Sequence, residues 1–264
     1  MRKEPLVKLE RPPLIFSLAQ VRFSPVLKIA DYIPDIQDVL RKGDFPRFQQ
    51  QQIQQLVFAP KVEVTQDFRW VFSSTDQHEA VLLTKDFVVY ETNRYDVFET
   101  FVKKLEFVLS LVKEKVDVLM AERIGLRVVD LIRPAAGKAA VEFLQQPLRG
   151  LSAESFGAVS LLTHFLLQAK SAVGDFSIRS MGTEDGTFLP PDLVSTELVF
   201  DSPPAKGEQV IILDFDHVAP VNDAFDTKTL ISKIWELHDI TERAFKTAVT
   251  PEAINYWKVK RDQP

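Results

Sequence analysis

The sequence predicts an α+β fold, a curved antiparallel sheet with its helices packed on one face. Several segments alternate apolar and polar residues, which is typical of strands with one buried side. Two long segments, 97–112 and 227–248, instead repeat apolar residues at the spacing of an amphipathic helix. A sheet and an amphipathic helix bury their apolar sides against each other, so this combination favours helices that lie on a sheet.

The first half of the chain opens with a charged lead-in, residues 1–10, before its first predicted elements. Alternation predicts a strand over 14–23, which Ser24-Pro25 ends. Helical spacing then predicts a helix over 29–40, with Gly43 as its stop. A glutamine-rich surface patch follows over 49–55 and is expected as a turn of polar helix or a loop. Three strands are then predicted over 68–72, 80–83 and 87–90, and a long helix over 97–112.

The second half repeats this order of elements. Ile124, Leu126 and Val128 alternate with polar or small residues and predict a strand over 124–128. A short helix is expected near 139–148, and a tail over 251–264. Between them we expect four strands and the second long helix: 159–168, 176–179, 194–200, 210–217 and 227–248.

The repeated order predicts an internal duplication, with one unit over 11–118 and a second over 119–250. Asp96 and Asp226 both precede a long helix, where an acidic residue complements the helix dipole. Aligning these aspartates matches further residues of the two helices: Phe101 with Ile231, Lys103 with Lys233, Leu105 with Trp235, and Glu106 with Glu236. We therefore expect two superposable halves, in which Leu105 and Trp235 are both buried against their own sheets.

Composition limits the classes of function. The chain has 264 residues, of which 45% are hydrophobic, and this suffices for a sizeable core in one or two domains. Its net charge of −5 argues against a nonspecific nucleic-acid binder, which needs a basic surface. There is no cysteine, so we expect neither a disulfide nor a cysteine-ligated metal. Because no apolar stretch approaches the length of a membrane span, we expect a cytoplasmic protein that does not enter a membrane.

A doubled unit of strand, helix, meander and long helix resembles the architecture of the TATA-box-binding protein and of helix-grip proteins. In that architecture a curved sheet carries two long helices on its back. The DNA-binding saddle of the TATA-box-binding protein depends on a basic concave face, and the acidic balance of this chain speaks against such a use. The resemblance therefore concerns the fold and leaves the function open.

Three segments resemble a sporadically distributed bacterial family of uncharacterised proteins of about this length. They are Pro12-Pro13-Leu14 with the nearby 19–23, the central 122–130 with its Arg-Ile-Gly-Leu-Arg, and Leu237-His238-Asp239 followed by Trp257. Phe16 stands where members often have a glutamate, and Val128-Val129-Asp130 replaces their Tyr-Ile-Asn. The resemblance runs along nearly the whole chain and implies no settled activity.

The motifs of several enzyme classes are missing from the sequence. Gly137-Lys138 lacks the upstream glycine and the following hydroxyl of a phosphate-binding loop, and no Gly-x-Ser-x-Gly occurs. None of the four histidines lies at the spacing of a metal site, so we expect no metal and no cofactor. Alternation places His164 and His217 among apolar neighbours and predicts core or boundary positions for both. For His238, capping, packing and a role in a site all stay open.

Two arginines of one predicted strand form the best candidate for a ligand site. Arg123 and Arg127 point the same way, and Gly125 between them leaves room. Guanidinium groups bind carboxylates and phosphates through paired hydrogen bonds, so these arginines are a candidate anion clamp. Ion pairs with Asp130 or Glu122, or a solvated face, would explain the same residues. The full candidate set is Arg123, Arg127, Asp130, Arg22 and His238.

These observations favour a non-catalytic binding or adaptor protein that uses a curved sheet face or the cleft between sheet and helix. The expected partner is another protein or a small anionic ligand, and a nucleic acid is not expected. The alternative is an enzyme with an arginine, aspartate and histidine site at the junction of the repeats, acting on an anionic small molecule. An aromatic excess in the first strands, more than two helices would cover, predicts a homodimer: Trp70, Phe72, Phe87 and Tyr90.

Overall fold

A computed structural model of the chain describes residues 9–58, 62–151, 153–158, 162–193 and 196–258. The elements of the first half are β1 (Leu14–Phe23), α1 (Ile29–Lys42), β2 (Arg47–Phe58), β3 (Val62–Ser73), β4 (Glu79–Leu83), β5 (Phe87–Thr92) and α2 (Phe98–Val116). The second half contains β6 (Met120–Ile132), β7 (Thr163–Lys170), β8 (Asp175–Thr183), β9 (Val210–Ala224), α3 (Thr227–Ala248) and α4 (Pro251–Lys258). Short 3-10 turns also lie in this half: η1 (Ala140–Phe143), η2 (Gln146–Leu148), η3 (Ala153–Phe156) and η4 (Pro191–Leu193).

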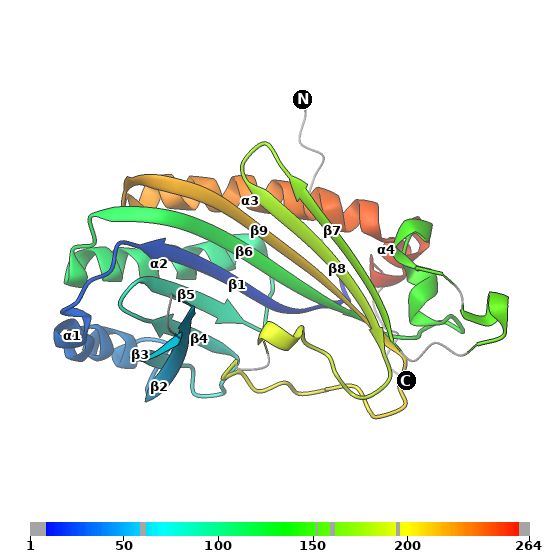
Figure 1. Ribbon diagram of the computed structural model, residues 1–264, viewed down its shortest axis with the longest axis horizontal. Coiled ribbons are helices and arrows are strands. Elements are labelled where there is room, and N and C mark those ends of the chain that lie inside the picture. Colours follow the sequence, from blue (N-terminus) through cyan, green and yellow to red (C-terminus); the bar gives the residue numbers. More distant parts are fainter. Residues whose placement is uncertain (1–8, 59–61, 152, 159–161, 194–195, 259–264) are drawn as a thin grey trace.

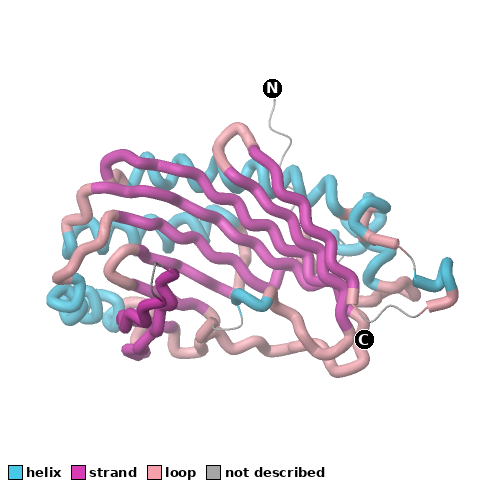
Figure 2. The backbone as a smooth tube through the Cα atoms, viewed as in Figure 1, coloured by secondary structure: helices cyan, strands magenta, loops and turns pink. Residues whose placement is uncertain are grey.

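The strands form one nine-stranded sheet with the order β2-β3-β4-β5-β1-β6-β9-β8-β7. All neighbours are antiparallel. Helices α2 and α3 run behind the sheet in Figures 1 and 2, and the opposite face is turned toward the viewer. The predicted α+β class, with helices packed on an antiparallel sheet, is confirmed.

Each half of the chain places its first strand beside its last one. β1 pairs with β5, and β6 pairs with β9. β5 leads into α2 and β9 leads into α3. The two first strands, β1 and β6, pair with each other at the centre of the sheet. The long helices therefore follow strands that lie on either side of this central pair.

Helices α1, α2 and α3 cover one face of the sheet, which we call the helix face. Their apolar stripes meet the inward side chains of the central strands in one core, in which Phe23, Leu105, Leu109, Ile124 and Ile234 are almost fully buried. Burying an apolar side chain of this size contributes about 1.5–3 kcal/mol. Among the described residues, none of the helices combines the length and the apolarity that crossing a membrane requires.

Helix α4 extends this layer at the other end of the sheet. Its Trp257 is buried, and the Trp257 ring lies 6.0 Å from that of Phe143 and 5.9 Å from that of Phe245. The expected tail over 251–264 is thus a helix as far as Lys258. This helix forms because its apolar side closes a core that the last turns of α3 leave open.

The opposite face of the sheet is partly covered by the segment 184–209 that connects β8 to β9, described over 184–193 and 196–209, which we call the strap. The strap is the yellow segment that runs across the sheet toward β4 and β5 in Figure 1. Its Leu189 and Leu198 pack in a separate apolar cluster with Val129, Leu131 and Ile212 of the sheet. We call this side of the sheet the strap face.

Three predicted elements differ from the structure. The glutamine-rich patch 49–55 is neither a helical turn nor a loop but part of β2, because β3 pairs with it along the whole strand and satisfies its backbone. The short helix expected near 139–148 is instead the two turns η1 and η2. In the predicted strand 194–200, the described residues 196–200 belong to the strap, where Leu198 packs flat on the sheet instead of pairing at its edge.

The aromatic residues that predicted a homodimer do not form a surface patch. Trp70, Phe72 and Tyr90 are buried in the core beneath α1 and α2. Phe87 packs instead in the cluster of the strap face. Exposed apolar side chains gather elsewhere, at and beside the edge strand β7: Leu162, Leu166 and Leu167.

The two long helices are not equivalent in detail. Leu105 of α2 is buried in the core as predicted, whereas Trp235 of α3 is only partly buried and packs edge-to-face on Phe98 of α2 at 4.8 Å. Asp226 is the N-cap of α3 and accepts a hydrogen bond from Thr229 N at 2.8 Å. At α2 the N-cap is Val97, which provides no side-chain hydrogen bond.

Candidate functional site

Two features of the strap face carry polar side chains, an ionic cluster and a cavity, and strand β6 contributes a residue to each. Leu126 and Ile132 of this strand belong to the cores of the helix face. Side chains alternate along a strand, so Arg127, Val129 and Leu131 point to the strap. Arg127 belongs to a cluster of ionic side chains, and Leu131 lines a cavity. Four strand positions, about 13 Å, separate the two.

The ionic cluster consists of two arginines and two aspartates from four separate segments. Arg127 Nε donates to Asp214 Oδ1 at 2.8 Å, and Arg127 Nη1 donates to Asp192 Oδ2 at 2.6 Å. Nη2 of Arg127 reaches the second oxygen of each carboxylate, at 3.1 and 3.0 Å. Arg179 Nε donates to Asp214 Oδ2 at 2.6 Å, and its Nη1 lies 3.3 Å from Asp192 Oδ1. Arg127 therefore holds two carboxylates, each through a pair of hydrogen bonds.

The two carboxylates have different surroundings. Asp214, on β9, is fully buried between the arginines, whereas the side chain of Asp192, on η4 of the strap, is 53% exposed. The hydrogen bonds from Arg127 hold the pKa of Asp192 well below its usual range. Asp216 lies opposite Arg127 on β9, and burial raises its pKa. The cluster thus reaches solvent at Asp192.

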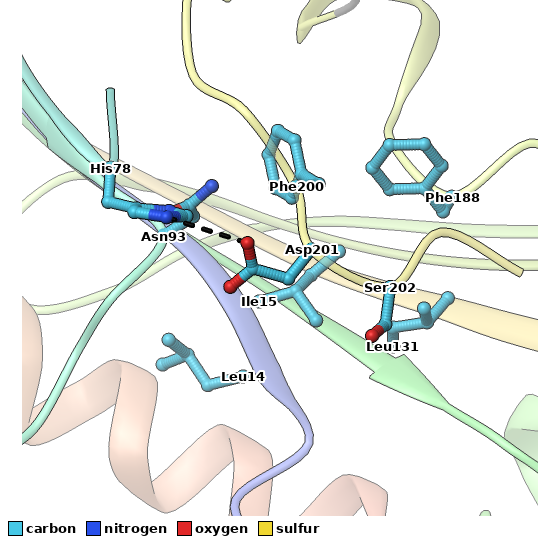
Figure 3. Close-up of a pocket in the computed structure, with 9 residues that line it drawn as sticks. All are labelled: Leu14, Ile15, His78, Asn93, Leu131, Phe188, Phe200, Asp201 and Ser202. Atoms are coloured by element: carbon cyan, nitrogen blue, oxygen red, sulfur yellow. Dashed lines mark hydrogen bonds and ion pairs between the residues drawn. The ribbon is translucent and has the colours of Figure 1, made fainter. Parts of the chain in front are cut away.

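A cavity of about 180 Å³ lies between the strap and the sheet, beside the end of β6 (Figure 3). The rings of Phe188 and Phe200, both from the strap, form one wall and pack edge-to-face with their centroids 5.0 Å apart. The remaining apolar lining is supplied by the sheet: Leu14, Ile15 and Leu131. Apolar walls with a few polar groups are typical of small-molecule sites.

His78 is the polar centre of the cavity. Its side chain is almost fully buried, and its Nδ1 lies 2.7 Å from Asn93 Oδ1. An amide oxygen only accepts, so this contact assigns a hydrogen to Nδ1, and in the neutral imidazole Nε2 is then an acceptor. Nε2 lies 3.6 Å from Asp201 Oδ1, the contact that is dashed in Figure 3. A ligand donor at this end of the cavity would meet both Nε2 and the carboxylate.

Further polar contacts tie the strap to the first half of the sheet. Thr196 Oγ1 donates to Glu91 Oε1 at 2.8 Å, and burial raises the pKa of Glu91 to about 7. Gln51 Nε2 donates to Glu197 Oε1 at 2.6 Å. Burial disfavours the charged form of Glu91, which thus differs from an ordinary surface glutamate.

Two more residues of the candidate set lie on the strap face but make other contacts. Arg123 is exposed, and its Nη2 lies 3.4 Å from Gln20 Oε1. Arg22 donates to Asp86 Oδ2 at 2.6 Å. Because Arg127 is bound to Asp192 and Asp214, the structure does not bring Arg123 and Arg127 together on one ligand position.

Asp130 and His238 lie on the helix face, with the sheet between them and Arg127. Burial raises the pKa of Asp130 to about 8, and its Oδ2 makes no hydrogen bond to any described residue. His238 stacks on Phe98 with the two rings 3.6 Å apart, and burial lowers its pKa. The set predicted from the sequence is therefore divided between two faces, and His238 packs between the long helices.

The other two predicted core histidines have different outcomes. His217 is fully buried, and its two ring nitrogens contact Leu237 O at 3.1 Å and Ser171 Oγ at 2.8 Å. His164 is exposed, so its predicted core or boundary position is wrong. The reason is that β7 is the edge strand of the sheet, where alternation no longer means burial of either face.

Sequence reasoning missed the residues that complete both features. Arg179, Asp192 and His78 lie far from Arg127 in the chain, and none belongs to a recognisable motif. For Arg179, one signal was available, because it alternates with Phe176 and Ile178 in a predicted strand. Asp192 lies in the turn η4, and His78 lies directly before β4. At such positions no apolar periodicity predicts which face of the sheet a side chain points to.

No protein-family model matches the chain, and no curated protein does. Within the described part of the chain, no group of three or more histidine, aspartate or glutamate side chains is arranged to hold a metal ion.

Proposed function

We propose that the protein is a non-catalytic binding protein whose ligand occupies the cavity between the strap and the sheet. The observation that carries this proposal is the cavity of about 180 Å³, in which apolar walls surround two converging polar groups, the His78 ring at Nε2 and the Asp201 carboxylate. The helices occupy the other face of the sheet, so the strap face is the curved sheet surface that remains for binding.

The chemistry of the cavity favours a small apolar molecule that carries a primary ammonium group. An ammonium group has three donors and no acceptor, which suits the Asp201 carboxylate and, in the neutral imidazole, His78 Nε2. The rings of Phe188 and Phe200 would attract a cation and also pack on apolar surface. A ligand carboxylate would instead face Asp201, a group of the same charge.

Three probes of similar size test this chemistry: benzylamine, benzyl alcohol and benzoate. Calorimetry and ligand-observed NMR would measure their affinities for the full chain at pH 7. Benzylamine should bind at least about tenfold more tightly than benzoate, because a charge-assisted hydrogen bond contributes about 1.5–3 kcal/mol. Equal affinities for the three probes, or no saturable binding of benzylamine, would contradict the proposal.

Two variants locate the binding site. Leu131→Phe places a larger side chain in the cavity and should abolish benzylamine binding, whereas the matched control Leu166→Phe alters an exposed leucine of β7 and should not. Asp201→Asn keeps the shape of an exposed side chain and should weaken benzylamine more than benzyl alcohol. Binding that survives Leu131→Phe unchanged would place the ligand elsewhere.

The alternative is an enzyme that acts on an anionic small molecule. Its expected site combined Arg127 with Asp130 and His238. Arg127 lies on the strap face, whereas Asp130 and His238 both lie on the helix face. Turnover of a substrate in a broad hydrolase and nucleotide screen, lost in Arg127→Ala, would favour this alternative over the binding proposal. An inactive chain that binds benzylamine would favour the binding proposal.

We also propose that the chain is a tandem repeat of the kind found in the TATA-box-binding protein and in helix-grip folds, with a cytoplasmic location. What supports the repeat is the placement of β1 beside β5 and of β6 beside β9, each followed by a long helix. The test is a superposition of residues 11–118 on 119–250. Failure of β1, β5 and α2 to overlay on β6, β9 and α3 would remove this proposal and leave the binding proposal untouched.

A further inference from the structure

The amino groups of two guanidiniums converge on one position in the ionic cluster. Nη1 and Nη2 of Arg127 donate to the two oxygens of Asp192, at 2.6 and 3.0 Å. Nη1 and Nη2 of Arg179 approach the same carboxylate at 3.3 and 3.5 Å. Four amino groups thus surround a single carboxylate, which is the geometry that guanidinium pairs present to a planar anion.

Asp214 orients both arginines toward this position. The Nε atoms of both arginines donate to the Asp214 carboxylate, at 2.8 Å from Arg127 and 2.6 Å from Arg179. Asp214 is fully buried on β9, and Arg127 is almost fully buried on β6. The arginines are therefore oriented by the sheet, and Asp192 of the strap is not needed to aim them.

Asp192 differs from the other members of the cluster in both exposure and attachment. Its side chain is 53% exposed, and it lies in the strap, in the short turn Pro191–Leu193, and not in a strand. A carboxylate in this place is bound to the arginines but also accessible to solvent. Such a group is accessible to exchange with an anion from solution.

We propose that Arg127 and Arg179 form a binding site for the carboxylate of an external ligand, and that Asp192 is its intramolecular occupant in the free protein. A ligand carboxylate would displace Asp192, accept the same amino hydrogens and leave the inner contacts to Asp214 in place. This site is separate from the cavity, about 13 Å along β6 from Leu131. The inference therefore goes beyond the proposed function and does not depend on it.

The charges of the cluster favour this exchange. With Asp192 removed, two arginines face the carboxylate of Asp214 and the neighbouring Asp216. Burial disfavours the ionised form of Asp216. Of the two carboxylates that contact both guanidiniums, only Asp214 then stays, so the position that Asp192 leaves adjoins two cationic groups and attracts an anion.

The variant Asp192→Ala tests the proposal, because it leaves a carboxylate-sized space in front of the four amino groups. Formate, acetate and inorganic phosphate are titrated into the full chain at constant ionic strength set with sodium chloride. The NMR signals of the arginine Nε groups and the melting temperature report binding. Formate and acetate should bind Asp192→Ala saturably and raise its melting temperature.

The wild-type chain should bind the same anions at least about tenfold more weakly, because the tethered Asp192 competes at a high effective concentration. Asp185→Ala is the matched control, since Asp185 lies in the strap and contacts Thr183 and Thr187 but neither arginine. It should behave as the wild type. In the Asp192→Ala background, Arg179→Met should abolish the response to formate, and Arg123→Met should leave it.

Several outcomes would overturn the proposal. They are a response of Asp192→Ala to formate no larger than that of Asp185→Ala, a response that persists after Arg179→Met, and tighter binding of phosphate than of formate. The last result would assign the site to phosphoryl groups instead of carboxylates. If Asp192→Ala does not fold in chloride, folding that returns with formate supports the proposal, and a chain that stays unfolded with formate contradicts it.

Discussion

Two strand pairs of this sheet lead into long helices, and the way each pair is joined differs greatly. Thr84–Asp86 alone joins β4 to β5 before α2, whereas the strap, residues 184–209, joins β8 to β9 before α3. The short turn is closed locally: Thr84 Oγ1 donates to Asp86 Oδ1 at 2.9 Å and accepts from Phe87 N at 3.1 Å. The strap is closed by contacts to distant strands.

The difference shows where this protein places its polar chemistry. The turn Thr84–Asp86 combines these internal hydrogen bonds with backbone contacts at and beyond the end of β1, where Phe23 N donates to Asp86 O and Val26 N donates to Lys85 O. The strap crosses the sheet, and its polar residues find partners on β5, β6 and β8, which creates both the ionic cluster and the cavity. Long loops over a rigid sheet commonly carry function for this reason.

The largest expected loss of stability concerns α2 and α3, the two helices that follow these connections. Leu105→Asp should unfold the protein, since it buries an unpaired charge in the core, with a loss above about 4 kcal/mol. Trp235→Asp should lose clearly less, because Trp235 is only partly buried between α2 and α3. Urea unfolding followed by circular dichroism measures both. Equal losses would indicate that Trp235 is as deeply buried as Leu105.

The next largest loss of stability is expected for an aspartate of β9, and the comparison is with an aspartate of the turn between β4 and β5. Asp214→Ala leaves two arginines without their buried counter-ion and should destabilise the fold by about 3–5 kcal/mol. Asp86→Ala, in the short turn, removes a hydrogen bond and a part-exposed ion pair to Arg22 and should cost about 1 kcal/mol. Denaturant midpoints of the two variants give the comparison. A smaller loss for Asp214→Ala than for Asp86→Ala would mean that the ionic cluster does not hold the strap.

A pH series distinguishes the two faces of the sheet. Burial raises the pKa of Asp130, on the helix face, from 3.8 to about 8, and that of Glu91, beneath the strap, from 4.5 to about 7. The folded protein keeps protons that the unfolded chain releases, so each group's contribution to stability falls as the pH rises between its two pKa values. The stability difference between Asp130→Asn and wild type should therefore grow with pH up to about pH 8 and then stay constant. For Glu91→Gln the same difference should stop growing at about pH 7.

Thermal unfolding of the two variants and the wild type at pH 5, 7 and 9 measures this gain. The comparison with wild type removes the contributions of other groups, such as His217 and His238, whose pKa values burial lowers. A difference from wild type that stays constant across the series would show that Asp130 and Glu91 titrate near their ordinary values in the fold.

The smallest expected effect concerns the starts of α2 and α3. Asp226→Ala removes the side-chain cap of α3 and should cost about 1 kcal/mol. Val97→Asp adds a cap and a favourable charge at the start of α2 and should stabilise by roughly 0.5–1 kcal/mol. Chemical denaturation resolves changes of this size. A loss of stability in Val97→Asp would show that Val97 contributes more by packing than a cap would gain.

The sequence by itself determined most of the elements on the helix face. The predicted strand 14–23 and the predicted helix 227–248 match β1 and α3 to the residue, and α1 ends beside Gly43 as expected. Periodicity is reliable here because a buried helix stripe or strand side must be apolar at every turn of its repeat. Two regions that differ from the prediction, 49–55 and the described residues 196–200, have no such requirement, since the first is paired through its backbone and Leu198 of the second packs on the sheet.

Only the tertiary structure decided the site. From the sequence, Arg127 could be recognised as a candidate, but its partners Asp192 and Asp214 come from a strap and a strand far along the chain. Asp130 was grouped with Arg127, yet it lies three positions further along β6, and this odd number places its side chain on the opposite face. Local periods determine which side of a strand is buried, whereas the partners of a charged side chain depend on which distant segments the sheet order and the strap bring beside it.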